Sequence, residues 1–364
     1  MNVGGPAILV ADLLRNIDPI KFEQVLVTGY CDAGEADYLE EVATDIAAIR
    51  VNGLGRSVSP LKDFKAFFEL IGVIRKFKPN VIHTHTAKAG VLGRLAGLIA
   101  TPRAKRVHTF HGHLLVGYFS KRTTYLVVQT EKILALLSTK LVAIGNKVKQ
   151  DLIQAGIGSE TKFEVIFPGL QDLTVHAKGD ARADLNLAVT KTYIVFVGRL
   201  TQIKRPDRLL DIAQFIKAQY PMAHLLVAGE GELYESTMDR AKVNELPMSF
   251  LGWRNDIDLI LSACDIAVLC SDNEGIPLTL IQAAQAGLPI VSTDVGSVSD
   301  IVKDGDNGLL TEVSSAGLIK GLSVLLDDAD LRKKFGVAGQ KRAQALFSSH
   351  AMVQHHQELY AQIV

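Results

Sequence analysis

The sequence predicts an α/β protein of two domains, each built on a parallel sheet that is covered by helices on both faces. Three observations predict this fold class. Short apolar, often β-branched runs alternate with longer amphipathic patterns in both halves of the chain, as parallel α/β sheets require. The 364 residues exceed one ordinary hydrophobic core. Glycines and charged residues follow several strand-like runs, at the edge where such sheets bind ligands.

The first predicted domain covers residues 1–170. It opens on Gly4 and Gly5, a glycine-rich turn that leads directly into a helix, although a loop of this kind normally follows a strand. We expect strands at 24–29, 80–86, 106–112, 140–145 and 163–169, helices at 64–79, 89–100 and 146–155, and a long helical stretch before residue 140.

The second predicted domain covers residues 191–346, and residues 347–364 form a final helix. Residues 171–190 lack a strand signal and are predicted to link the two domains. We expect strands at 192–200, 224–231, 248–253, 266–271 and 289–296, with helices at 205–219, 232–243, 255–263 and after Pro277.

Composition indicates a soluble globular protein, with 48% hydrophobic residues, a mean hydropathy of +0.20 and a formal net charge of zero. The balance gives no support to nucleic acid binding. Residues 1–170 carry 21 Lys and Arg against 15 Asp and Glu, whereas residues 171–364 carry 18 against 24. A basic first half suits an anionic ligand or a membrane surface, and ordinary surface variation is the alternative.

The sequence predicts a cytoplasmic location. Its three cysteines, Cys31, Cys264 and Cys270, show no CxxC spacing, and their odd number argues against a disulfide framework. The longest apolar run is interrupted by Glu131 and Lys132, so it does not reach the ~20 residues of a membrane span. We find no secretory signal.

The stretch NEGIPLTLIQAAQAG, residues 273–287, places Glu274 in the loop that feeds a helix and Gln282 inside that helix. Pro277 suits a first helical turn, and Gly287 with Pro289 ends the helix. A helix N-terminus exposes unpaired N–H groups and a partial positive charge, which can hold a phosphate or a sugar hydroxyl. A solvated loop carboxylate and a surface amide are the alternative.

Two cations follow the strand that ends at Gly198. Arg199 and Lys204 lie on the loop after this strand, where they can neutralise a diphosphate, Arg with two parallel hydrogen bonds and Lys as a point charge. The alternative is a solvated pair on an exposed loop.

The histidines and aspartates near strand and helix ends raise the question of a metal. We expect no zinc site, because no Cys or carboxylate joins the histidines and residues two apart are simply neighbours on one strand face. Asp256 and Asp258 could bind a metal ion together, or they could mark the start of a helix. We favour the helix start, because Asp near a helix N-terminus interacts favourably with the helix dipole. A single ligand-facing histidine, His111, is the preferred interpretation of the set His83, His85, His108, His111 and His113.

Seven segments, given at the end of this paragraph in chain order, together resemble the retaining glycosyltransferases of family 4. These enzymes have two Rossmann-like domains and the architecture called GT-B. The resemblance runs over nearly the whole chain, and Glu274 with Gln282 resembles the family's E-x7-E motif, with Gln in place of the second Glu. Within the family, the segments resemble those of bacterial enzymes that build surface polysaccharide on lipid-linked acceptors. The segments are NVGGPA, HTHTAKAG, HTFHGH with GYFS, VGRLTQIKRPDRLL, VAGEGEL, FLGWRNDI and NEGIPLTLIQAAQAGLPIVSTDVG.

The resemblance implies transfer of a hexosyl or N-acetylhexosaminyl group from a nucleotide sugar, expected to be a UDP-sugar, with retention. The acceptor is expected to be a carbohydrate or a lipid-linked precursor, reached through peripheral contact with the inner face of the membrane. No metal or other cofactor is expected, because Arg199 and Lys204 take the place of a metal at the diphosphate.

The resemblance also assigns roles to single residues. Arg199 and Lys204 bind the diphosphate, and Glu274 holds sugar hydroxyls. The residue at the Gln282 position binds the nucleotide ribose, and His111 reaches the sugar near the reacting carbon. The final helix packs back on the first domain. Gly4, His85 and Lys88 are candidates on the acceptor side. The expected donor-binding residues are Gly5, Gly198, Trp253, Arg254, Gly275, Ile276, Pro277, Leu278 and Gln282.

Two departures from the family leave alternatives open. The family usually has Glu where Gln282 stands, and the first strand, normally at the centre of the first sheet, is missing. Either Met1 is not the true start or the domain is incomplete and weakly active. A GT-B nucleotide-sugar epimerase and a degenerate, non-catalytic binding or scaffold protein are therefore kept as alternative functions.

Overall fold

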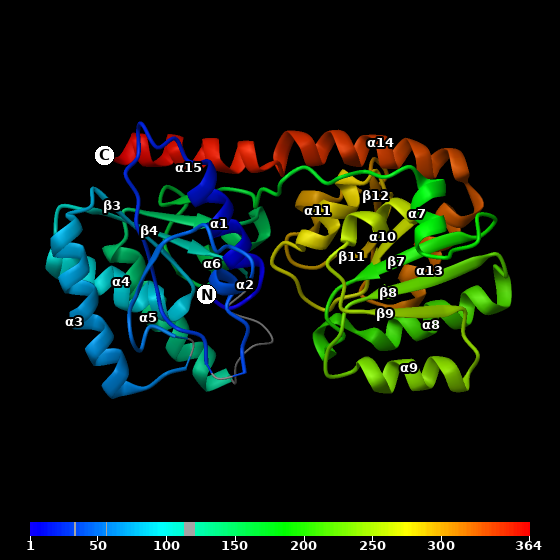
Figure 1. Cartoon of the computed structure of the whole chain (residues 1–364), viewed down its shortest axis with the longest axis horizontal. Coiled ribbons are helices and arrows are strands. Elements are labelled where there is room, and N and C mark those ends of the chain that lie inside the picture. Colours follow the sequence, from blue (N-terminus) through cyan, green and yellow to red (C-terminus); the bar gives the residue numbers. More distant parts are fainter. Residues whose placement is uncertain (33, 56, 113–120) are drawn as a thin grey trace. The chain divides into compact units, whose positions relative to one another are not determined.

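The chain folds into two compact units in this computed structural model, which describes residues 1–32, 34–55, 57–112 and 121–364 (Figure 1). Unit 1 comprises residues 1–169 and 349–364, and unit 2 comprises residues 170–348. Each unit alternates parallel strands with helices, so the predicted α/β class is confirmed. No helix of the described residues combines the length and the apolar character that crossing a bilayer requires.

Unit 1 contains two separate parallel sheets, one with the order β1-β2 and one with the order β3-β4-β5-β6. Its elements are α1 (Gly5–Asn16), β1 (Leu26–Thr28), α2 (Tyr38–Glu41), β2 (Ala48–Arg50), α3 (Pro60–Phe77), β3 (Val81–His85), α4 (Ala87–Ala100), β4 (Lys105–Phe110), α5 (Lys121–Leu137), β5 (Lys140–Ala143), α6 (Asn146–Gln154), β6 (Phe163–Val165) and α15 (Ser349–Ile363).

Separate apolar clusters show which helices cover the larger sheet of unit 1. Leu9 and Leu13 of α1 share a cluster with Val142 of β5 and Val353 of α15, and α1 packs against α15. The second cluster joins Leu70 and other residues of α3 to α4, with Ile82 of β3 packed against it. The final helix therefore belongs to the core of unit 1.

Unit 2 is built on one six-stranded parallel sheet with the order β12-β11-β10-β7-β8-β9. Its elements are α7 (Lys178–Asp184), β7 (Thr192–Val197), the 3₁₀ helix η1 (Gln202–Lys204), α8 (Pro206–Gln219), β8 (Ala223–Ala228), α9 (Tyr234–Val243), β9 (Met248–Gly252), α10 (Ile257–Ala263), β10 (Ile266–Leu269), α11 (Leu278–Gln285), β11 (Ile290–Thr293), α12 (Val298–Ile301), β12 (Gly308–Thr311), α13 (Ser315–Asp327) and α14 (Ala329–Leu346).

The segment 171–190, predicted as a linker, is instead part of unit 2 and contains α7. Arg182 of α7 is buried, donates to the Ala263 carbonyl at 2.9 Å and pairs with Asp265 at 2.7 Å. A buried arginine held by a carboxylate and a carbonyl ties this helix to α10. The seven-residue helix was missed because it is too short to show a clear apolar period.

Candidate functional site

The loops at the carboxyl edge of the unit 2 sheet approach one another through glycines. Gly198 follows β7, and its N–H donates to the Ala228 carbonyl at 2.9 Å. A Cβ atom on Gly229 would lie 2.2 Å from the Gly198 oxygen, and Gly229 has a φ of 128°. Side chains are excluded at this contact, so the loop that carries Gly198 and Arg199 meets the loop after β8 backbone to backbone.

Lys204 and Glu274 form an ion pair between the loop after β7 and the loop after β10. The Lys204 Nζ lies 2.5 Å from Glu274 Oε1, and the two side chains are 22% and 10% exposed. Ser271, which follows β10, donates its hydroxyl to the same carboxylate oxygen at 2.6 Å. Glu274 is therefore held in one orientation by a cation and a hydroxyl that come from different loops.

The backbone around Glu274 is fixed by the loop that follows β11. A Cβ atom on Gly296 would lie 1.7 Å from the Glu274 carbonyl oxygen, and Gly296 has a φ of 53°. The next residue, Ser297, donates its N–H to the Gly275 carbonyl at 3.0 Å. Only glycine fits at position 296, so this loop sets the path of the chain at Glu274.

Residues Gly275 to Leu278 form the turn that enters α11. Ile276 is 7% exposed and Pro277 is buried. The sequence predicted Pro277 in the first turn of α11, but Pro277 is the N-cap, so the helix starts one residue later than predicted. The first N–H groups of α11 are therefore directed toward the region next to Glu274, as at any helix N-terminus.

Other predicted donor residues lie on neighbouring loops of unit 2. Arg199 is exposed, and its guanidinium has no partner among the described residues. Trp253 is 70% exposed, and its backbone N–H donates to Glu230 Oε1 at 3.2 Å. Gln282 is partly exposed on α11.

Arg254 is engaged within its own loop. Its Nε donates to Asp256 Oδ1 at 2.7 Å, and its Nη2 bonds Oδ2. This pairing raises the pKa of Arg254 and lowers the pKa of Asp256. Asp256 is also the N-cap of α10, and Asp258 lies in its first turn, so the helix-start interpretation of this pair is confirmed.

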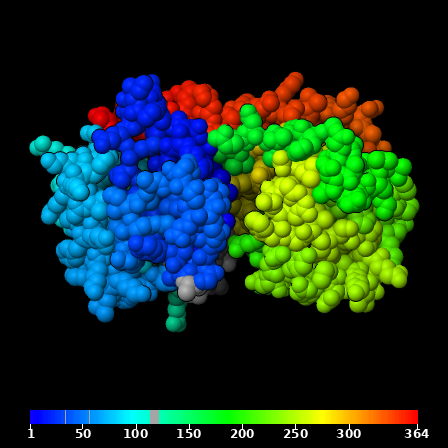
Figure 2. All heavy atoms as spheres, viewed as in Figure 1, coloured from blue at the N-terminus to red at the C-terminus, as the bar shows by residue number. Residues whose placement is uncertain are grey.

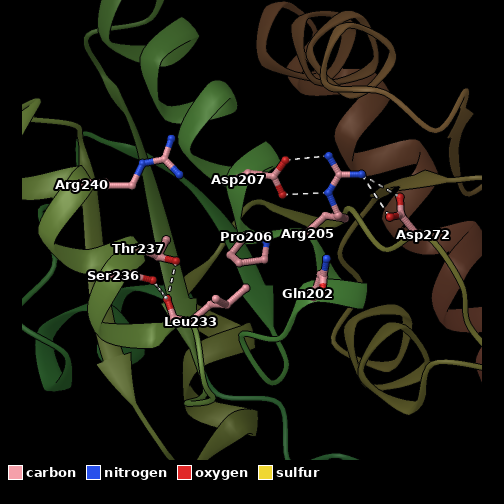
Figure 3. Close-up of a pocket in the computed structure, with 9 residues that line it drawn as sticks. All are labelled: Gln202, Arg205, Pro206, Asp207, Leu233, Ser236, Thr237, Arg240 and Asp272. Atoms are coloured by element: carbon pink, nitrogen blue, oxygen red, sulfur yellow. Dashed lines mark hydrogen bonds and ion pairs between the residues drawn. The ribbon is translucent and has the colours of Figure 1, made fainter. Parts of the chain in front are cut away.

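A pocket of about 380 Å³ opens on unit 2 between the loop after β7 and the start of α9 (Figure 3). Arg205 lies on one side of it, bonded to both Asp207 and Asp272. Ser236 and Thr237 donate to the Leu233 carbonyl in the opposite wall. None of the predicted site residues lines this pocket.

In unit 1, the predicted His111 pairs with His85. The His85 Nδ1 lies 2.8 Å from His111 Nε2, and the two rings are 5.1 Å apart. His111 Nδ1 is buried and has no hydrogen-bond partner within the described part of the chain. Burial lowers the pKa of His111 to about 4. The imidazole is therefore neutral at pH 7 and can accept or donate one hydrogen bond without adding charge.

The histidine set is divided between the two faces of the sheet. His83 bonds Tyr360 of α15 at 2.6 Å and Thr109 at 2.7 Å, on the same side as His85. His108 bonds Thr84 at 2.9 Å on the side of α4. Among the described residues, no group of three or more His, Cys, Asp or Glu side chains is placed to hold a metal ion. His113 and the GYFS segment lie outside the described residues.

The remaining predicted residues of unit 1 have structural partners. Lys88 pairs with Asp63 at 2.6 Å and donates to the Ser57 carbonyl at 2.5 Å. Gly4 is the N-cap of α1 and Gly5 is its first residue, which confirms the predicted turn into a helix.

Comparison with known proteins decides the family. The profile described as Glycosyltransferase Family 4 matches residues 3–172, and the profile described as Glycosyl transferases group 1 matches residues 177–342. The chain is 31% identical over 307 residues to the UDP-Gal:alpha-D-GlcNAc-diphosphoundecaprenol alpha-1,3-galactosyltransferase of Escherichia coli, covering 80% of this chain and 77% of that protein. The chain belongs to glycosyltransferase family 4.

Further comparisons agree with this family. The chain is 25% identical to the putative glycosyltransferase EpsD of Bacillus subtilis, covering 84% of this chain and 82% of that one. The crystal structure of Anabaena Alr3699/HepE with UDP and glucose matches with a TM-score of 0.81 at 19% identity, covering 98% and 96% of the two chains. The GT-B fold and glycosyltransferase activity are thus confirmed, and the epimerase alternative is not favoured.

Sequence reasoning missed two partners of the predicted residues of this family 4 glycosyltransferase. Ser271 was not singled out, although a small hydroxyl residue three positions before Glu274 at a strand end is a recognisable signal. Tyr360 lies 277 residues from His83 in the chain. No local pattern could connect those two side chains.

Proposed function

We propose that this glycosyltransferase moves a hexosyl group from a UDP-sugar to a lipid-linked diphosphate acceptor, with retention and without a metal ion. The observation that carries the proposal is the ion pair of Lys204 with Glu274, beside the N-terminus of α11. This arrangement places a cation, a carboxylate and helix N–H groups on adjoining loops, a set that suits a sugar bound to a diphosphate.

The pair Lys204–Glu274 is a resting arrangement in this proposal. When a donor arrives, Lys204 exchanges its carboxylate partner for diphosphate oxygens, and Glu274 accepts hydrogen bonds from sugar hydroxyls. The Ser271 hydroxyl keeps the carboxylate oriented during the exchange. Arg199, exposed and without a partner in the described part of the chain, supplies the second positive charge.

Bond cleavage proceeds through an oxocarbenium-like state, with negative charge growing on the leaving UDP. Arg199, Lys204 and the first N–H groups of α11 stabilise this charge as it forms, and such preorganised groups lower the barrier without reorganising. The acceptor hydroxyl attacks on the face that UDP leaves, and the departing phosphate takes its proton, which gives retention. His111 contacts the sugar as a neutral imidazole in this proposal.

The proposed acceptor class follows from the E. coli relative, whose name specifies a diphosphoundecaprenol acceptor. Such a substrate resides in a bilayer, so the enzyme must work in peripheral contact with a membrane surface. The basic first half of the sequence is compatible with that surface.

The test incubates the purified enzyme with a panel of UDP-, GDP- and ADP-sugars and a short-chain polyprenyl-diphosphate-linked sugar acceptor. We expect a product only with a UDP-hexose, and its formation should persist in excess EDTA. By NMR, the transferred sugar should keep the anomeric configuration that it has in the donor. An inverted product contradicts retention. Absence of both donor binding and transfer contradicts the proposed function and favours the non-catalytic alternative.

A further inference from the structure

Asp272 lies on the loop after β10, two residues before Glu274. Its backbone N–H donates to the Ile203 carbonyl at 2.9 Å. Ile203 directly precedes Lys204, the partner of Glu274 in the candidate site. A backbone hydrogen bond therefore joins the loop after β7 to the loop after β10 in the immediate neighbourhood of the ion pair.

The Asp272 side chain makes a second connection between the same two loops. Its oxygens accept hydrogen bonds from Arg205 Nη1 at 3.1 and 3.2 Å, and Arg205 directly follows Lys204. Arg208, in the first turn of α8, places its Nη2 2.7 Å from Asp272 Oδ1. Two arginines thus hold one carboxylate, and we call Arg205, Arg208 and Asp272 the Asp272 cluster.

Arg208 connects this cluster to the core of unit 2. Its side chain is buried, and its Nη1 donates to the Cys270 carbonyl at 2.6 Å, directly after β10. A buried guanidinium needs a counter-charge, because an unpaired charge in the interior is strongly destabilising. Asp272 supplies that charge, so the position of its carboxylate is fixed by a buried group of α8.

Arg205 adopts a backbone conformation that favours glycine. Its φ of 52° lies in the left-handed region, which is sterically unfavourable for a residue that carries a Cβ atom. Its Nε and Nη2 bind Asp207 at 2.9 and 2.7 Å, and Figure 3 shows the guanidinium between the carboxylates of Asp207 and Asp272. Such a conformation persists where the surrounding contacts determine it. The contacts of the side chain therefore hold the chain in place directly after Lys204.

The Asp272 cluster is separate from the ion pair of Lys204 with Glu274. In the proposed function a donor breaks that ion pair, because Lys204 turns to the diphosphate and Glu274 to the sugar. The contacts of Asp272 with Arg205 and Arg208 involve neither of these side chains, so they remain when the donor is bound. A connection that the donor does not break keeps the two loops at one spacing, as preorganised binding groups require.

We propose that Asp272 is a positioning residue for donor binding, which holds Lys204 at the distance from Glu274 that a sugar diphosphate requires. Asp272 acts through Ile203 and Arg205, on either side of Lys204, and not by touching the donor. The inference rests on the proposed function and deepens it by naming the residue that sets the spacing of the two donor-binding loops.

The exposed side of the cluster forms one wall of the pocket in Figure 3, opposite Ser236 and Thr237 of α9. In Figure 2 the yellow-green residues of α9 form part of the surface of unit 2. The side chains of Arg205 and Asp272 are 32% and 42% exposed. Because partly exposed ion pairs contribute little to stability, we expect substitutions of these two residues to leave unit 2 folded.

The experiment compares the affinities of the full chain for UDP and for UMP by calorimetric titration. The second phosphate of UDP adds charge that Lys204 is proposed to bind, so Lys204→Ala should lower the ratio of the two affinities and is the positive control. Asp272→Asn keeps the backbone bond to Ile203 but removes the carboxylate charge. We expect it to lower the UDP-to-UMP ratio by about fivefold, within the range of couplings between contacting groups, and to leave UMP affinity unchanged.

Arg205→Gly provides an independent variant. Glycine adopts the left-handed conformation without strain, so this change removes the guanidinium while the backbone can keep its path. It should lower the ratio as Asp272→Asn does. The matched control is Asp207→Asn, which removes the partner of Arg205 that lies on α8 and should keep the ratio of the parent protein. An equal fall in this control, or an unchanged ratio in either folded variant, overturns the proposal.

A double-mutant cycle separates positioning from a general loss of stability. In the Lys204→Ala background, Asp272→Asn should lower UDP affinity no further, because the group that it positions is absent. Additive losses overturn the proposal. Amide hydrogen exchange of residues 200–206, measured without ligand, should be faster in Asp272→Asn than in Asp207→Asn, and equal exchange in the two variants contradicts the proposed connection.

The same titrations distinguish this inference from the proposed function. If the parent protein binds neither UDP nor a UDP-sugar, the proposed function fails and the inference fails with it. If the parent binds UDP more tightly than UMP, while Asp272→Asn and Arg205→Gly keep the parent ratio, the inference alone fails.

Discussion

Lys204 Nζ and Glu274 Oε1 lie 2.5 Å apart although 70 residues separate them in the sequence. Lys204 ends the 3₁₀ helix after β7, and Glu274 lies between β10 and α11. Because β7 and β10 are neighbours in the sheet, their carboxyl ends bring these two side chains together. The segment 274–282 and the loop that carries Arg199 and Lys204 are thus parts of one candidate site.

Arg199→Ala and Lys204→Ala should each remove most transfer while leaving the fold intact. Each change deletes a charge that acts on the leaving diphosphate, an effect on the order of 3 kcal/mol, or about a hundredfold in kcat. Steady-state kinetics with a UDP-sugar measures the loss. Arg240→Ala, an exposed arginine of the same unit, is the control and should keep full activity. Near-native turnover by the double variant contradicts the assignment.

Ser271→Ala should weaken donor binding several-fold while preserving Lys204–Glu274 contact. The hydroxyl donates to a carboxylate, and such charge-assisted hydrogen bonds are worth about 1.5–3 kcal/mol before water replaces the lost partner. Calorimetric titration with a UDP-sugar gives the affinity, and Ser236→Ala on α9 is the control. Identical affinity for the parent and Ser271→Ala would show that Ser271 does not orient Glu274.

Transfer should persist in excess EDTA. Arg254 engages Asp256 at the start of α10, and His176 Nε2 lies 3.2 Å from Asp258 Oδ2, so both carboxylates of this pair have partners within the fold. The measurement compares initial rates with EDTA, with added Mn²⁺ and with added Mg²⁺. Complete loss of activity that Mn²⁺ or Mg²⁺ restores would establish a metal role and refute the metal-free proposal.

Gln282→Glu should strengthen donor binding by a few-fold to about tenfold, or ~1 kcal/mol. A carboxylate can accept from two ribose hydroxyls, whereas the amide offers one acceptor oxygen, and repulsion from the diphosphate offsets part of the gain. Titration of parent and variant with a UDP-sugar and its 2′-deoxyribose analogue completes the cycle. If both proteins discriminate between the two nucleotides by the same ratio, Gln282 does not contact the ribose.

The stability of the chain should fall as the pH drops from about 6.5 to about 4. His356 is 6% exposed, and burial lowers its pKa to about 4. Between its unfolded and folded pKa values the unfolded chain binds the proton, so folding stability is full above pH 6.5 and declines toward pH 4. A shift of this size corresponds to about 3 kcal/mol.

Calorimetric melting temperatures across this pH range test the prediction. His356→Gln should melt at a temperature that depends less on pH, whereas His355→Gln, an exposed neighbour on the same helix, should follow the parent. Equal pH dependence of all three proteins would show that His356 contributes nothing to it.

Local patterns in the sequence were sufficient for the long elements and for the order of the loops. The strand ending at Gly198 and the helix after Pro277 were predicted because each has a clear apolar period and a defined stop. The helix α7 was missed, since its stability comes from the buried contact of Arg182 with Asp265, 83 residues away. Period and propensity carry no information about a contact of that kind.

The candidate site, too, could be predicted from the sequence only in part. Arg199, Lys204 and Glu274 were predicted from residue type and position at strand ends. The direct bond of Lys204 to Glu274, the bond of His85 to His111 and the engagement of Lys88 by Asp63 required the fold, because each joins residues from different strand–helix units. Whether Gln282 contacts the ribose stays a prediction.

Gly296 gives the site an unusual dependence on a residue that has no side chain. Its backbone touches the Glu274 carbonyl so closely that alanine would push the chain at Glu274 outward. For directed evolution of sugar preference, position 296 is consequently closed to substitution, while the partly exposed side chain of Gln282 is open to it. A library that randomises whole loops will lose most of its members at this one glycine, whereas a library that spares it can explore new donors on an unaltered backbone.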